Sequence, residues 1–250
     1  TLEDRSEWPQ PWIKEIESGR ERQLTHGSTY VYDFDWSPDS TRLAFTADPK
    51  GSSAVTEDHH LALIDLEGKV QVLADQPAQH SRPRFSPSGD RLAFLRDRRI
   101  ERGYYVNVTD LFVMDLDTGK TLHLTADATY DLGGGGWTRW HPDGESIWFT
   151  AAQRALRRLY RIPAIGGKAR QVSKGKTSLV AVDLDAECRK AAFTMSDFVH
   201  PADLFTTGLK EWQPRRWTQV RDSVAKFGLT GPSTMIWTAP DGIEVEGFLF

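Results

Sequence analysis

The sequence has only one cysteine in 250 residues, Cys188, so no disulfide can form within the chain and no cysteine cluster can bind a metal. Its seven histidines follow no spacing that suits metal ligands, and we predict neither a metal nor another cofactor. A single cysteine fits reducing surroundings. We therefore expect the protein to be cytoplasmic.

An excess of one charge sign and a long apolar run are also missing. Lys and Arg number 31 against 35 Asp and Glu, which gives a formal net charge of −4. This near-balance argues against nucleic acid or an anionic membrane surface as the main partner. No apolar run reaches the roughly 18 residues of a spanning helix, so no membrane segment is predicted. The first residues, 1–5, have neither an initiator Met nor a signal-peptide pattern, which is typical of a processed, truncated or excerpted chain.

Aromatic and turn-forming residues are abundant. The chain has nine Trp, twelve Phe and six Tyr, together with 20 Gly and 13 Pro. Many short aromatic strands separated by turns produce this mixture. The composition therefore favours an all-β fold.

One phrase recurs four times: an apolar residue, a turn, and a Phe nine residues after the apolar residue. The leading positions are Trp36, Phe85, Trp140 and Leu184, and the trailing ones are Phe45, Phe94, Phe149 and Phe193. Each phrase predicts a β-hairpin, because Pro presets φ in the turn and Asp or Ser caps its own backbone. The fourth unit has lost the Pro and the Asp of the turn, which leaves its turn geometry in doubt. A second hairpin follows each phrase, so each unit supplies four strands.

Four-stranded units in tandem are typical of β-propeller blades. We predict blades at about 30–77, 80–127, 136–176 and 179–222 and a half blade at about 8–26, all within a propeller domain over 1–222. A blade cannot bury both faces alone, so aromatic side chains are expected between neighbouring blades. The side chains expected there are Trp36, Phe45, Phe85, Phe94, Trp140 and Phe149.

The rhythm changes from about Ser223. Residues 236–250 read as two strands joined by a Pro-Asp-Gly turn at 240–242. The W-S-P-D-x-x-x-L-A-F repeats, the L-x-x-x-D-L-x-x-G-K outer hairpins and this tail together resemble the prolyl oligopeptidase family of serine peptidases, in particular its acylaminoacyl-peptidase-like branch. In that family a segment like the tail opens the α/β-hydrolase domain.

The resemblance implies a partial propeller of antiparallel four-stranded blades, with about two and a half of seven blades upstream. It also implies that 223–250 form a linker and the first strands of an α/β-hydrolase domain that is otherwise absent. The implied role is gating of substrate for a serine peptidase that hydrolyses short peptides or N-acylated peptides through an acyl-serine. The implied partners are a short peptide substrate and the protein's own hydrolase domain. A homo-oligomer is compatible with the resemblance.

No catalytic residue can be assigned in this chain. The family's nucleophile lies in a G-x-S-x-G turn, and the nearest match, Gly231-Pro232-Ser233-Thr234-Met235, fails at its last position. We therefore expect these 250 residues alone to be inactive. The alternative is a non-enzymatic binding propeller of the periplasmic Tol translocation type, which would share the repeats but would not need the tail.

Two groups of residues are candidates for substrate gating. The first are the charges directly before the leading apolar residues, which end the innermost strands: Asp35, Arg84, Arg139 and Asp183, with Asp33 and Arg82 two positions earlier. They either face the channel and guide a peptide, or form inter-blade salt bridges and a hydrated wall. The second are Arg102, Tyr104 and Tyr105, in an insert at 96–109, which either reach substrate or the partner domain or belong to a solvated loop.

Overall fold

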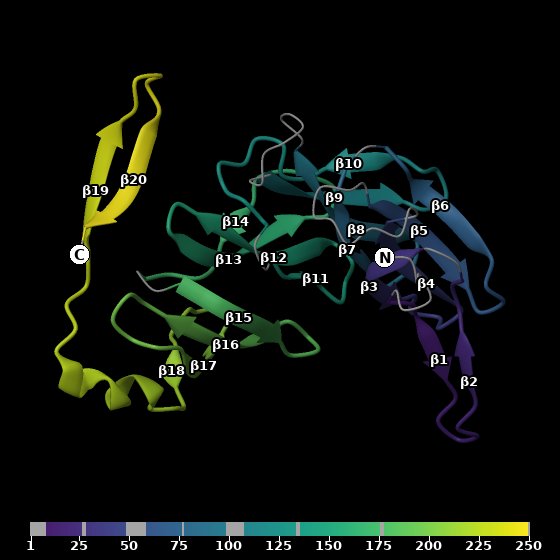
Figure 1. The fold of residues 1–250 in the computed structure, drawn as a ribbon, viewed down its shortest axis with the longest axis horizontal. Helices are drawn as coiled ribbons and strands as arrows, with labels where there is room; N and C mark the ends of the chain where they lie inside the picture. Colours follow the sequence, from purple (N-terminus) through teal and green to yellow (C-terminus); the bar gives the residue numbers. More distant parts are fainter. Residues whose placement is uncertain are drawn as a thin grey trace, which may run out of the picture.

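A computed structural model describes residues 9–26, 29–48, 59–76, 78–98, 108–133, 136–175 and 178–249. These residues form four antiparallel sheets of four strands and two further strand pairs, and the sheets follow one another around the molecule (Figure 1). The four-stranded sheets confirm the predicted all-β, propeller-type fold.

The strands of each sheet follow chain order. The first sheet contains β3 (Tyr30–Trp36), β4 (Arg42–Asp48), β5 (His60–Asp65) and β6 (Val70–Ala74). The second contains β7 (His80–Phe85), β8 (Arg91–Arg98), β9 (Val108–Asp115) and β10 (Thr121–His123). The third contains β11 (Thr138–Trp140), β12 (Ser146–Gln153), β13 (Leu156–Pro163) and β14 (Arg170–Gln171). The fourth contains β15 (Ser178–Leu184), β16 (Lys190–Ser196), β17 (Asp203–Gly208) and β18 (Arg215–Arg216).

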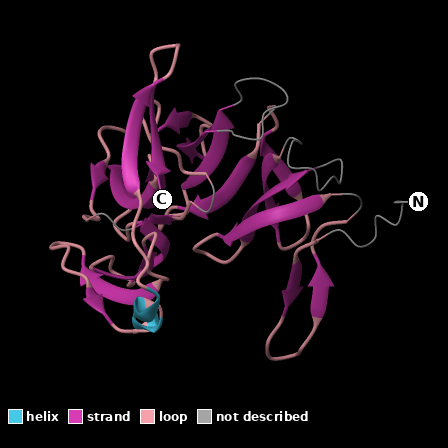
Figure 2. Cartoon of the chain, turned by 60° about the vertical axis from the view of Figure 1, so that its left-hand side comes forward, coloured by secondary structure: helices cyan, strands magenta, loops and turns pink. Residues whose placement is uncertain are grey.

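The remaining elements lie at the two ends of the described chain. The pair β1 (Trp12–Lys14) and β2 (Glu21–Gln23) precedes the first sheet. After the fourth sheet come two 3₁₀ turns, η2 (Val220–Ser223) and η3 (Ala225–Phe227), drawn in cyan in Figure 2. The hairpin of β19 (Ser233–Thr238) and β20 (Glu244–Leu249) follows.

The first turn of every sheet has the same backbone. The fourth residue after the leading apolar position has a left-handed φ in all four: Ser40 at 59°, Gly89 at 77°, Gly144 at 71° and Cys188 at 51°. The fourth turn keeps this geometry without Pro because the carboxylate of Asp185 accepts hydrogen bonds from the N–H groups of Arg189 (2.6 Å) and Lys190 (2.7 Å). The doubt raised by the sequence is therefore resolved in favour of the same turn.

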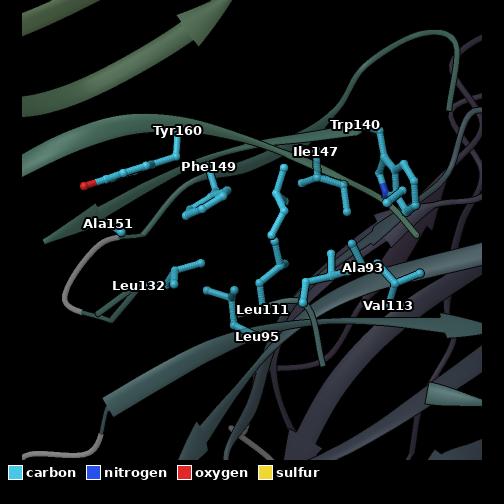
Figure 3. Packing of buried hydrophobic residues seen from close by; sticks show 13 residues of the cluster. Ala93, Leu95, Leu111, Val113, Leu132, Trp140, Ile147, Phe149, Ala151 and Tyr160 are labelled. Atoms are coloured by element: carbon cyan, nitrogen blue, oxygen red, sulfur yellow. The ribbon is translucent and has the colours of Figure 1, made fainter. Parts of the chain in front are cut away.

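Apolar side chains fill the space between neighbouring sheets. Figure 3 shows Leu95 and Leu111 of the second sheet facing Ile147 and Phe149 of the third, all of them buried. Five of the six aromatic residues predicted at such positions are buried: Phe45, Phe85, Phe94, Trp140 and Phe149.

The prediction is wrong for Trp36, which is 43% exposed. The side chains of Phe85 and Trp140 are each covered by an arginine of the sheet before them. Arg91 of the second sheet lies over the ring of Trp140 at 5.0 Å, and its Nη2 donates to the carbonyl of Gly144 at 2.7 Å. Arg42 of the first sheet makes the equivalent contacts. Its guanidinium lies over the ring of Phe85, and its Nη2 donates to the carbonyl of Gly89. Only the short pair β1–β2 precedes the sheet of Trp36 in the described residues, and no arginine is recorded over the indole of Trp36 there.

Candidate functional site

A pocket of about 330 Å³ lies where the first strands of the sheets end. Its lining includes three of the predicted charges together with exposed and half-buried indoles: Arg84, Arg139, Asp183, Trp36 and Trp137. Strand β7 contacts both β3 and β11, which brings together residues about 50 positions apart in sequence. This repetition of one strand position in successive sheets is what assembles the pocket.

Asp35 does not line the pocket and instead joins two sheets. Its Oδ2 accepts a hydrogen bond from the N–H of Phe85 at 2.9 Å. Burial raises the pKa of Asp35, although this hydrogen bond and the charge of Arg84 act in the opposite direction. Asp33 makes the equivalent contact, since its Oδ2 accepts from the N–H of Arg82 at 3.3 Å. Both acids of β3 therefore hold the backbone of β7.

Arg139 and Asp183 also connect sheets. The Nη1 of Arg139 donates to Oδ1 of Asp183 at 2.9 Å and to the carbonyl of Leu184 at 2.8 Å. Asp183 is largely exposed, so this pair contributes little to stability, on the order of 0–1 kcal/mol. Asp35, Arg139 and Asp183 thus all make contacts between sheets, and a substrate role for them stays a prediction.

Arg84 is different from the other candidates. Its Nη1 donates to the carbonyl of the preceding Pro83 at 2.7 Å, and it forms no ion pair within the described part of the chain. Its own carbonyl accepts the indole N–H of Trp140 at 2.9 Å, which fixes the backbone of this position. The guanidinium is half-buried at the pocket, where it can bind an anion.

The second group of candidates cannot be placed. Arg102, Tyr104 and Tyr105 lie in 99–107, outside the described residues. Their role in contacting substrate or a partner domain also stays a prediction.

The C-terminal hairpin lies at the opposite end of the sheets from the pocket. In each sheet the first turn lies at one end, and the connection between the second and third strands lies at the other. The hairpin contacts connections of the latter kind: Nη1 of Arg154 lies 3.1 Å from Oε2 of Glu246, and the rings of Phe198 and Phe248 are 4.4 Å apart. Strands of seven or eight residues separate the two ends by about 23–26 Å.

The residue that fixes the exit from the last sheet was not found from the sequence. Asp203 is 1% exposed and accepts hydrogen bonds from the hydroxyl of Thr218 (2.6 Å), the N–H of Val220 (2.7 Å) and Nε of Arg221 (3.0 Å). Burial acts to raise its pKa, but these hydrogen bonds outweigh burial, and the pKa of Asp203 is lowered. Asp203 thereby ties η2 to β17.

A sequence signal for this arrangement exists. A hydroxyl residue after the outermost strand accepts the N–H of a residue in the third strand: Thr125 from Leu111, Ser173 from Leu159 and Thr218 from Leu204. The hydroxyl follows an apolar residue each time, as in Leu124-Thr125, Val172-Ser173 and Trp217-Thr218. This recurrence marks the end of the second, third and fourth sheets.

The described residues show neither a metal cluster nor a membrane-spanning helix. They contain no group of three or more His, Cys, Asp or Glu side chains placed to hold a metal ion. None of their helices has the length and apolar character needed to cross a membrane.

Comparisons with known proteins place the chain among peptidase relatives. No family model matches it. It is 29% identical over 150 residues to dipeptidyl-peptidase 5 of Porphyromonas gingivalis, a match that covers 58% of this chain and 21% of the relative. It is 36% identical over 80 residues to the uncharacterized peptidase YuxL of Bacillus subtilis, covering 32% of this chain and 11% of the relative. These matches therefore span about a fifth or less of the length of the curated relatives.

Solved structures with low sequence identity show the same fold. Puromycin hydrolase matches with a TM-score of 0.65 at 15% identity, over 93% of this chain and 35% of that protein. TolB from Acinetobacter baumannii matches with a TM-score of 0.60 at 18% identity, over 92% of this chain and 51% of that protein. The sequence relatives and the fold together confirm the resemblance seen in the repeats: the chain is a β-propeller segment of the kind found in prolyl oligopeptidase-family peptidases.

Proposed function

We propose that this chain is the substrate-gating propeller portion of a serine peptidase that hydrolyses short peptides or N-acylated peptides through an acyl-serine. In this proposal the catalytic groups belong to an α/β-hydrolase domain that begins at the linker, 223–250. The propeller admits short peptides and excludes folded proteins. The reaction needs no metal or other cofactor.

The C-terminal hairpin carries this proposal. One of its faces meets the propeller through Glu246 and Phe248. The other face is apolar, with Met235, Trp237 and Leu249 exposed at 48%, 47% and 59%. An apolar sheet face of this kind requires a covering layer, because sheets bury their apolar faces against other elements. A hydrolase domain built on these two strands supplies that layer and leaves the propeller on its other side.

The pocket supports a gating role rather than a catalytic one. It lies at the far end of the sheets from the hairpin, so a peptide reaching a hydrolase domain through the propeller would meet Trp36, Arg84 and Arg139 first. Aromatic and Arg side chains suit this contact, because Trp, Tyr and Arg are enriched among the residues that contribute most to binding at protein interfaces. Asp35 and Asp183 keep the first strands in place around this opening.

The competing proposal is a non-enzymatic binding propeller of the Tol type. The similarity of the fold to TolB is compatible with this proposal too, because the fold alone does not separate the two. The names of the sequence relatives and the hairpin beyond the fourth sheet favour the peptidase.

The decisive experiment compares the full-length protein with residues 1–250. We expect the full-length protein to react with a fluorophosphonate at one site and to hydrolyse aminoacyl or acylaminoacyl p-nitroanilides, whereas residues 1–250 do neither. Stoichiometric labelling of the fragment would show that the nucleophile lies within it. A full-length protein that is neither labelled nor active would support the binding propeller instead.

A further inference from the structure

Strand β7 carries two arginines, Arg82 and Arg84, next to the two acids of strand β3. The carboxylates of Asp33 and Asp35, on β3, accept the backbone N–H groups of Arg82 and Phe85. Neither the side chain of Arg82 nor that of Arg84 forms an ion pair with any carboxylate in the residues described. The guanidinium groups of Arg82 and Arg84 therefore remain available to a carboxylate from outside the described residues.

Arg82 also has a backbone conformation that residues other than glycine rarely adopt. Its φ is 51°, and it lies in a bulge, because Ser81 pairs with Leu95 and Arg84 with Ala93 across the sheet. A left-handed φ is unfavourable for a residue with a Cβ, and bulges change the direction in which a side chain projects. Strain of this kind gathers at ligand-binding sites. The bulge therefore sets the direction in which Arg82 projects from the strand that also carries Arg84.

A third guanidinium lies near Arg82. The Nη2 of Arg157, in β13 of the next sheet, donates to the carbonyl of Gly133 at 2.8 Å. Burial is the main reason that the pKa of Arg157 is lowered; the carboxylate of Asp131 opposes this, and the charge of Arg82 adds to it. Positive charges from two sheets thus approach each other, an arrangement that an anion would stabilise.

We propose that Arg82 and Arg84 bind a carboxylate of the peptide substrate as it passes the propeller. This inference rests on the proposed peptidase function and specifies its substrate class. Guanidinium groups hold carboxylates by charge-assisted hydrogen bonds, often two at a time. The carboxylate comes from the C-terminus of the peptide or from an acidic side chain, and the experiment separates the two sources.

The experiment measures kcat/KM of the full-length protein for matched tripeptides. One pair shares a neutral sequence and differs in ending as a carboxylate or an amide; a second pair of amides differs in carrying Glu or Gln. We expect the wild-type protein to prefer the charged member of at least one pair about tenfold, in keeping with a charge-assisted hydrogen bond. The pair that shows the preference identifies the source of the carboxylate.

The variants are Arg82→Gln, Arg84→Gln and the double variant, with Arg82→Lys to retain the charge. The matched control is Arg170→Gln, an exposed arginine on the outermost strand of the third sheet. We expect the preference to fall to within twofold in the double variant and to persist in Arg170→Gln. Arg84 has ordinary strand geometry, so we expect Arg84→Gln to fold. If Arg82→Gln unfolds, Arg84→Gln still tests whether a guanidinium on this strand binds the carboxylate. Melting temperatures verify folding.

The outcomes are distinct from failure of the peptidase proposal. A full-length protein that hydrolyses none of the peptides contradicts the proposed function itself. Hydrolysis without preference in either pair overturns the carboxylate site and leaves the peptidase intact. A preference that is unchanged in a folded double variant also overturns the carboxylate site and leaves the peptidase intact.

Discussion

Trp140 shows how much one repeated position contributes when its surroundings are complete. Its ring is 6% exposed, its Nε1 donates to the carbonyl of Arg84, and Arg91 lies over its face. We expect Trp140→Ala to lower the free energy of unfolding by about 3–5 kcal/mol, because a large aromatic leaves a cavity. Urea unfolding measures it. The control is Trp36→Ala at the equivalent exposed position, where we expect a loss below about 1 kcal/mol; equal losses would contradict this account.

Asp203 makes stability depend on pH at the acid end. Hydrogen bonds from Thr218, Val220 and Arg221 outweigh burial and hold its folded pKa below the unfolded value of about 3.9. Its contribution is therefore fully present above pH 4 and is lost as pH falls through the folded pKa. We expect Asp203→Asn to lower the melting temperature at pH 7 and the difference from wild type to shrink toward pH 2. A difference that is independent of pH would contradict a role for the charge.

At the scale of one element, the first turn of each sheet gives a paired prediction. Gly89 and Ser40 occupy the same left-handed position in consecutive sheets. Gly89→Ala should destabilise by about 1–2 kcal/mol, since Ala is strained there and its Cβ would lie 3.4 Å from Pro38. Ser40→Gly should stabilise by up to about 1 kcal/mol, because it relieves the same strain. Opposite signs in thermal or urea unfolding confirm the shared geometry; like signs argue against it.

The strands were predictable because their signal is local and repeated four times. An apolar residue, a turn and a Phe in fixed register define two strands without knowledge of the rest of the chain. The contacts of Asp35 with Phe85 and of Arg139 with Asp183 were not predictable, because they join residues 50 and 44 positions apart. The sequence showed which charged residues end the first strands. It did not show that Asp35 accepts a hydrogen bond from a backbone N–H of the neighbouring sheet.

The exposure of Trp36 was also not predictable, because it depends on residues far away in the sequence. Its environment depends on the sheet before it, which no local pattern describes. The turn at Asp185 is the converse case, since a carboxylate replaced the expected Pro and Asp without changing the backbone. Local sequence patterns therefore predicted the strands and turns well, but they predicted the contacts between sheets poorly.

For the whole molecule, stability should vary with the number of neighbours of each sheet. The second and third sheets have a sheet packed on both sides, whereas the fourth buries one face and exposes Val180 and Leu204 on the other. Repeat architectures behave as chains of nearest-neighbour contacts. We expect amide exchange in the 1–250 chain to be slower in β8 and β12 than in β16, by about tenfold or more. Uniform protection across the sheets would contradict this picture.

Two arginines, Arg42 and Arg91, each donate to a turn of the next sheet along the chain. Arg42 binds the carbonyl of Gly89, and Arg91 that of Gly144, so the donor is made before its acceptor. During synthesis the residues of the earlier sheet leave the ribosome first. We therefore expect a circular permutation that places the second sheet before the first to slow refolding, measured by stopped-flow fluorescence, while leaving the final contacts unchanged.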